Sequence, residues 1–94
     1  MLNVKVVADY LSKPEADVIQ ESLRVLLLRE VSAIEAELAS FRQRYSVFDA
    51  LELREKIASG TIVTHPAWED LLEWENGLDA IADLRDLQDT CSTS

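Results

Sequence analysis

The residues best able to do chemistry lie in one short stretch, residues 65–75. His65 is the single histidine, and Glu69 follows four residues later, so one helical turn would bring a carboxylate to the imidazole, as a general base requires. His65 also precedes Pro66 at a position typical of a helix start, where a capping or surface role is more common. The pattern therefore favours a histidine that is not catalytic.

Acidic residues and two tryptophans share this stretch. Paired carboxylates can bind a divalent cation, but such a site needs oxygen ligands that converge from separate segments. A solvated acidic face is the better interpretation, and a face that binds a basic protein is a further one. Core packing is the default for both tryptophans: Trp74 lies on the apolar stripe, whereas Trp68, near the helix start, could instead anchor a partner. The residues predicted to face a partner are Trp68, Glu69, Asp70 and Glu73, and Asp79, Asp83 and Asp86 follow at helical spacings.

The sequence contains no phosphate-cradling loop, nucleophile elbow or Cys/His metal spacing, and its two glycines leave little room for such a loop. We therefore expect a protein that is not an enzyme and has no metal or cofactor. Cys91 is the single cysteine, which excludes an intramolecular disulfide and fits a reducing cytosol. Since no signal peptide or membrane span is recognisable, we expect a soluble, cytoplasmic protein.

The charge is distributed unevenly. The 94 residues carry a formal net charge of −9, but residues 1–30 hold four basic and five acidic side chains, a net −1, which leaves −8 for residues 31–94. Non-specific nucleic-acid binding depends on Lys and Arg contacts to phosphate, which an acidic chain lacks. A basic protein is the better partner, and only the near-neutral N-terminal part could approach DNA.

The elements that would position these residues are mostly helical and form one domain, residues 1–88. Alternation of Leu2, Val4 and Val6 predicts a short strand within residues 1–12, which would pair with its own copy or a partner's sheet edge, or else lie as an extended arm over the helices. A long helix over residues 13–45 follows, with Ser12 and Glu15 as a capping box.

Two further helices are predicted. Ser46 should cap a short helix over residues 47–58, with Gly60 as the left-handed residue of the turn after it. A C-terminal helix should cover residues 65–87, with Thr64 or His65 as its cap and Asn76-Gly77 as a weak point, because an interior glycine costs about 1 kcal/mol relative to alanine. Residues 89–94 should form a flexible tail.

One apolar stripe dominates the long helix. Its members recur at alternating spacings of four and three, the average period of a coiled-coil seam, and they are Leu27, Val31, Ile34, Leu38, Phe41, Tyr45 and Phe48. Upstream, the run Val25–Leu28 makes the helix apolar on several sides, so it needs more than one neighbour. We therefore expect an obligate helical homodimer or a partner contact through Ile19, Leu23, Leu26, Leu27 and Val31.

Two blocks carry a resemblance to a known family: Phe41-Arg-Gln-Arg-Tyr-Ser-Val-Phe48 followed by Gly60, and Trp68-Glu-Asp-Leu-Leu-Glu-Trp74-Glu. They resemble small acidic prokaryotic antitoxins of type II toxin–antitoxin systems. The segment Val18–Leu26 is similar to the helix that follows the strand in ribbon-helix-helix antitoxins. The resemblance implies an acidic, dimeric antitoxin that neutralises a basic RNase-like toxin encoded beside it.

The ribbon-helix-helix likeness also implies that a paired N-terminal strand could contact DNA through Asn3 and Lys5. One departure speaks against this: no Gly, Pro or Asn interrupts residues 15–45, where such proteins break after about three turns. Our prediction is a non-enzymatic, protein-binding antitoxin. The alternatives are a stand-alone helical oligomerisation module and a DNA-binding regulator.

Overall fold

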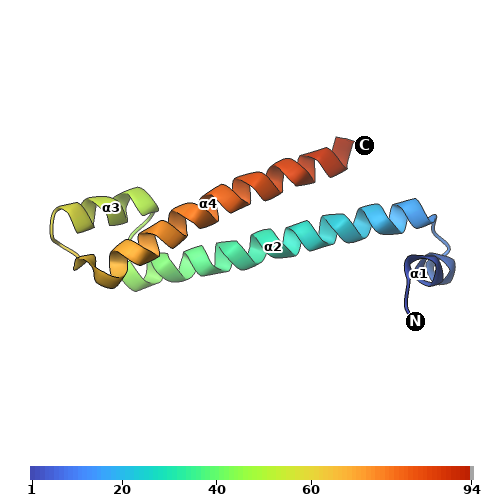
Figure 1. Cartoon of the computed structure of the whole chain (residues 1–94), viewed down its shortest axis with the longest axis horizontal. Helices are drawn as coiled ribbons and strands as arrows, with labels where there is room; N and C mark the ends of the chain where they lie inside the picture. The colour runs from blue at the N-terminus through green and yellow to red at the C-terminus, as the bar shows by residue number, and fades with distance from the viewer. Residues whose placement is uncertain (94) are drawn as a thin grey trace.

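The computed structural model describes residues 1–93, and of the last three of these only the backbone. Four helices occupy most of this range: α1 (Val4–Leu11), α2 (Glu15–Tyr45), α3 (Ala50–Ala58) and α4 (Thr64–Thr93). Figure 1 shows α2 and α4 as a long antiparallel hairpin, with α3 at its closed end and α1 at the other end of α2. The predicted mostly helical architecture is confirmed.

The core sits at the closed end of the hairpin, where α2, α3 and α4 meet. Leu53 of α3 and Leu71 of α4 are completely buried there, and the rings of Phe41 and Trp74 stack with their centroids 6.0 Å apart. Trp74 is therefore core, as its spacing predicted. This core holds the two long helices together and fixes the surfaces that α4 presents to solvent.

The stripe predicted on α2 faces α4 over most of its length. Val31, Leu38 and Phe41 are buried, and Leu27, Ile34 and Tyr45 are half-buried. Phe48 departs from the stripe and is 81% exposed, because α2 ends at Tyr45 and Ser46 adopts a left-handed conformation that redirects the chain. The same left-handed residue shows that Ser46 closes α2 and does not cap α3.

The predicted N-terminal strand is wrong, since no strand forms within residues 1–93 and residues 4–11 are helical. Alternation over Leu2, Val4 and Val6 competes there with a helical period that includes Val4, Val7, Ala8 and Leu11. The segment forms a helix for two reasons. Asn3 caps it, with its Oδ1 accepting a hydrogen bond from the Val6 amide at 2.9 Å, and Ala8 is buried where α1 packs on α2.

Two further local predictions need correction. Ser12 is the left-handed C-cap of α1, so Pro14 occupies the N-cap of α2 and makes no side-chain cap. Asp49 caps α3 in place of Ser46, with its Oδ1 accepting a hydrogen bond from the Glu52 amide at 2.8 Å. In both places a serine that resembles a helix start in sequence instead ends the preceding helix, whose last carbonyls its amide satisfies.

The remaining turn and the C-terminus are simple. Gly60 follows α3 with a φ of +81°, the left-handed conformation predicted for it. His65 has an extended backbone and a cis peptide bond to Pro66, so the regular part of α4 begins at Pro66. Residues 89–93, expected to be a tail, continue α4 because no breaker precedes them, and residue 94 lies outside the described residues.

The molecule is long and thin, with extents of 60 × 28 × 17 Å. Its radius of gyration is 19.2 Å, whereas a compact chain of this length would have about 12 Å. A thin shape leaves much apolar surface uncovered, most of it on α1 and the first half of α2. None of the helices within residues 1–93 combines the length and apolarity that a membrane span requires.

Candidate protein-binding surfaces

The four residues predicted to face a partner do not share one surface. Asp70 turns inward: its Oδ2 accepts a hydrogen bond from Arg44 Nη1 at 2.7 Å and another from the Tyr45 hydroxyl, and its side chain is only 14% exposed. Asp70 therefore ties α4 to the end of α2. Trp68, Glu69 and Glu73 remain exposed on α4.

The Asp70 contact alters the protonation of its partners. Hydrogen bonding to Asp70 raises the pKa of Arg44 above its ordinary value. Burial raises the pKa of Tyr45 above 10.0, and the hydrogen bond to Asp70 raises it further. Both groups thus hold their protons more firmly when folded, as expected for a structural contact between helices.

His65 and Glu69 come together as their spacing predicted, with Nδ1 and Oε1 2.7 Å apart. The pKa of Glu69 is lowered, first by a hydrogen bond from its own backbone amide and then by His65. The His65 side chain is 76% exposed, so the pair lies on open surface. This pair closes the first turn of α4.

Trp68 is 38% exposed and is positioned by a neighbour on α3. The Arg54 guanidinium lies over the indole, 5.8 Å from the ring centroid, and its Nη2 bonds to Glu75 Oε1 at 2.6 Å. The arginine therefore links Trp68 to Glu75, about two turns further along α4. A tryptophan that is fixed yet accessible is well suited to anchor a partner, because little side-chain freedom remains to be lost on binding.

Trp68 begins a continuous exposed stripe along the outer side of α4, away from α2. Its members recur at spacings of four, four, three, four and three, and they are Trp68, Leu72, Asn76, Asp79, Asp83 and Asp86. We call these six residues the acidic stripe. Within the described residues, its three aspartates take part in none of the ion pairs.

The acidic stripe revises the predicted partner-facing set. Asp70 makes an internal contact, whereas Asp79, Asp83 and Asp86 lie on the same exposed side of α4 as Trp68. The spacing of Asp79, Asp83 and Asp86 carries this signal, because it places them on the same helical face as Trp68, whereas the immediate sequence neighbours of Trp68 lie on other faces. Among the described residues, no group of three or more His, Cys, Asp and Glu side chains could hold a metal ion.

The residues predicted for the dimer or partner contact also separate. Ile19, Leu23 and Leu26 are 45%, 45% and 53% exposed, and Leu27 is half-buried. Val31 is only 3% exposed, because it lies where α4 covers α2. Val31 therefore belongs to the hairpin interior, and the uncovered surface begins further toward the N-terminus.

The residues suggested for DNA contact have other positions than a paired strand would give them. The Asn3 side chain caps α1, and Lys5 is exposed on the first turn of that helix. Without a strand in this part of the chain, the two-stranded ribbon that would carry them into a groove does not form.

These features define a small all-helical protein built on a long hairpin, with an acidic stripe on one helix and apolar surface near the N-terminus of the other. A family model matches residues 1–93, and the chain belongs to that family, the uncharacterized protein MJ0235 family. No curated protein and no solved structure matches the chain.

Proposed function

We propose that this protein is a non-enzymatic binding protein whose acidic stripe binds a basic protein, and that it acts as an antitoxin toward a basic, RNase-like toxin. The observation that carries the proposal is the acidic stripe itself. It joins an exposed, positioned Trp68 to three aspartates that form no ion pair among the described residues.

Charge gives the stripe a preferred partner. Residues 31–94 carry a net −8, so the potential around α3 and α4 attracts cations over a distance set by ionic strength. Trp68 and Leu72 would supply the apolar end of the contact, and the aspartates its charged end. The resemblance of residues 41–48 and 68–75 to antitoxins supports the more specific reading, in which the partner is a toxin.

The test is co-expression of the full chain with each small protein encoded beside it, a basic one among them being the expected partner. The two should co-purify, and the chain should relieve the growth defect that the basic protein causes alone. A triple variant, Asp79→Asn with Asp83→Asn and Asp86→Asn, should bind roughly tenfold more weakly at low salt, because it removes three charges from one end of the contact.

A matched control removes the same charge elsewhere. Asp9→Asn with Glu30→Gln and Glu37→Gln neutralises three exposed acids on α1 and α2, and should leave binding within about threefold of the wild type. Equal weakening by both triple variants would show that net charge, and not the acidic stripe, matters. A chain that binds no adjacent gene product would refute the antitoxin proposal and favour the oligomerisation module.

A further inference from the structure

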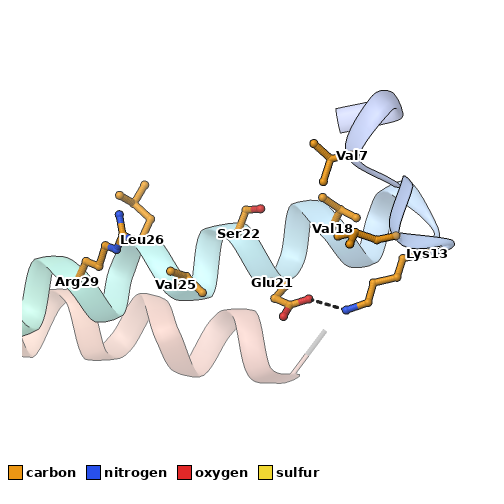
Figure 2. Close-up of a pocket in the computed structure, with 9 residues that line it drawn as sticks. Val7, Lys13, Val18, Glu21, Ser22, Val25, Leu26 and Arg29 are labelled. Carbon is orange, nitrogen blue, oxygen red and sulfur yellow. Dashed lines mark hydrogen bonds and ion pairs between the residues drawn. The ribbon is translucent and has the colours of Figure 1, made fainter. Parts of the chain in front are cut away.

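A second surface lies at the opposite end of α2, where α1 folds back across it and leaves a groove of about 380 Å³. Figure 2 shows Val7 of α1 directed toward Val18 of α2, with Ser22 and Leu26 along the open side. Its apolar lining comes from Val7, Leu11, Val18, Val25 and Leu26. We call this site the α1–α2 groove.

The rest of the chain does not cover this groove. Leu27 and Val31 of α2 turn toward α4, whereas Val18, Ser22 and Val25 lie on the other side of the same helix, and Figure 1 shows α1 and α4 on opposite sides of α2. Val18 at the floor is 8% exposed, but Leu11, Val25 and Leu26 at the walls are 50%, 45% and 53% exposed. An apolar groove with a buried floor and half-exposed walls is typical of a surface that binds a partner.

The charge of the groove favours a second copy of the chain over a basic protein as its occupant. A basic protein gains little here, because Lys13 and Arg29 line the groove and the Lys13 Nζ already neutralises Glu21 Oε2 at 3.2 Å. A second copy of the chain carries −9 in total but only −1 over residues 1–30. Two copies therefore repel each other least when these N-terminal parts meet and the acidic helices point apart.

We propose that the α1–α2 groove is the docking site for a second copy of this chain, with α1 and the first half of α2 packing on their counterparts about a two-fold axis. A two-fold interface uses the same patch twice, so a patch must be self-compatible in charge, as this one is. Arg29 takes part in none of the ion pairs among the described residues and can meet a carboxylate of the second copy. This proposal is independent of the function proposed for the acidic stripe.

Two leucines of α2 provide a matched test. Leu26 lines the groove and Leu28 does not, yet they are 53% and 57% exposed on the same turn of the helix. Sedimentation equilibrium of the full wild-type chain should give twice the 10.6 kDa chain mass. Leu26→Asp should give the single-chain mass, because the dimer would bury an unpaired charge, whereas Leu28→Asp should stay dimeric.

A wild type of single-chain mass at every concentration would overturn the proposal, as would equal behaviour of the two aspartate variants. If circular dichroism shows that Leu26→Asp loses its helices, the milder pair decides: Leu26→Ala should raise the dimer dissociation constant about tenfold or more, and Leu28→Ala less than about threefold. Equal shifts in the milder pair would also overturn it. A dimer that the groove variants leave intact would overturn the proposal, because its contact would then lie outside the groove.

The salt dependence of binding distinguishes self-association through the groove from binding of a basic protein to the acidic stripe. Screening reduces repulsion between two acidic copies, so the self-association constant should hold or rise with added NaCl, whereas binding of a basic protein to the acidic stripe should weaken. Self-association that weakens steeply with salt would contradict the apolar contact proposed for the groove.

Discussion

Replacing Gly77 by alanine should destabilise the protein, although helix propensity alone predicts the opposite. Gly77 lies inside α4, where alanine is favoured over glycine by about 1 kcal/mol. A Cβ atom there would lie 2.9 Å from Leu38 Cδ2 and 3.3 Å from Ile34 Cγ2 on α2. The glycine thus allows the two long helices to approach closely at the point where the core begins.

The magnitude follows from comparing the two effects. Leu38 is 2% exposed and belongs to the core with Phe41 and Trp74, so it cannot simply swing away from the new methyl group. Overpacking of this kind costs about 1–3 kcal/mol. Subtracting the gain in propensity leaves a net loss of up to about 2 kcal/mol, which is a fall in melting temperature of up to about 15 °C for a domain of this size.

Urea unfolding followed by circular dichroism measures this balance. Asn76→Ala, one residue away on the exposed side of α4, is the control and should stabilise, since it gains propensity without a new contact. In a Leu38→Val background, which removes the nearest atom, Gly77→Ala should lose most of its penalty. A Gly77→Ala variant more stable than the wild type by about 1 kcal/mol would refute the close-approach argument.

Three further predictions test other contacts. Folding raises the pKa of Tyr45 above 10.0, mainly through burial, so its contribution to stability is full below that pH and is lost as the pH rises through the folded pKa. In Tyr45→Phe, the free energy of unfolding should therefore fall less steeply with pH in the alkaline range, and identical slopes for the variant and the wild type would contradict this. Leu38→Asp should abolish the cooperative thermal transition, because a buried side chain becomes an unpaired charge, whereas Leu28→Asp should retain it. Asn3→Ala should cost about 1 kcal/mol through loss of the α1 cap, seen as faster hydrogen exchange in residues 4–11 with α4 unchanged.

Secondary structure can be predicted from the sequence where a hydrophobic pattern repeats over many turns. The stripe over residues 27–45 extends for five turns, so one or two ambiguous residues could not change its period. The structure places it on one continuous helix, with Val31, Leu38 and Phe41 buried. The N-terminal segment failed because only three residues carried the alternation. A cap by Asn3 and a buried Ala8 were then enough to reverse the outcome.

Other errors arose because a residue type has two local uses. Ser12 and Ser46 could each begin a helix, but each instead takes a left-handed conformation that ends one. By sequence, Asp70 is one of several acids expected on the surface of α4. Its hydrogen bonds to Arg44 and Tyr45, which lie 26 and 25 residues earlier in the chain, show that it instead joins two helices. Gly77 is likewise a weak point by helix propensity, whereas the structure places it against Leu38, which leaves little room for a side chain. Contacts between distant segments decide these cases, and periodicity within one segment does not contain them.

The separation of charge along this chain has a structural consequence. A hairpin places both of its long helices side by side, so an acidic α4 could have made the whole molecule uniformly repulsive to its own copy. Here α2 extends past the part of α4 that packs on it, and its near-neutral first half carries α1 and the apolar groove beyond the main core. The elongated shape therefore separates the two surfaces for which we propose different partners, the α1–α2 groove for a second acidic copy and the acidic stripe for a basic protein. Ser22→Asp would add a negative charge to the groove, so it should weaken self-association and leave binding of a basic protein to the acidic stripe unchanged.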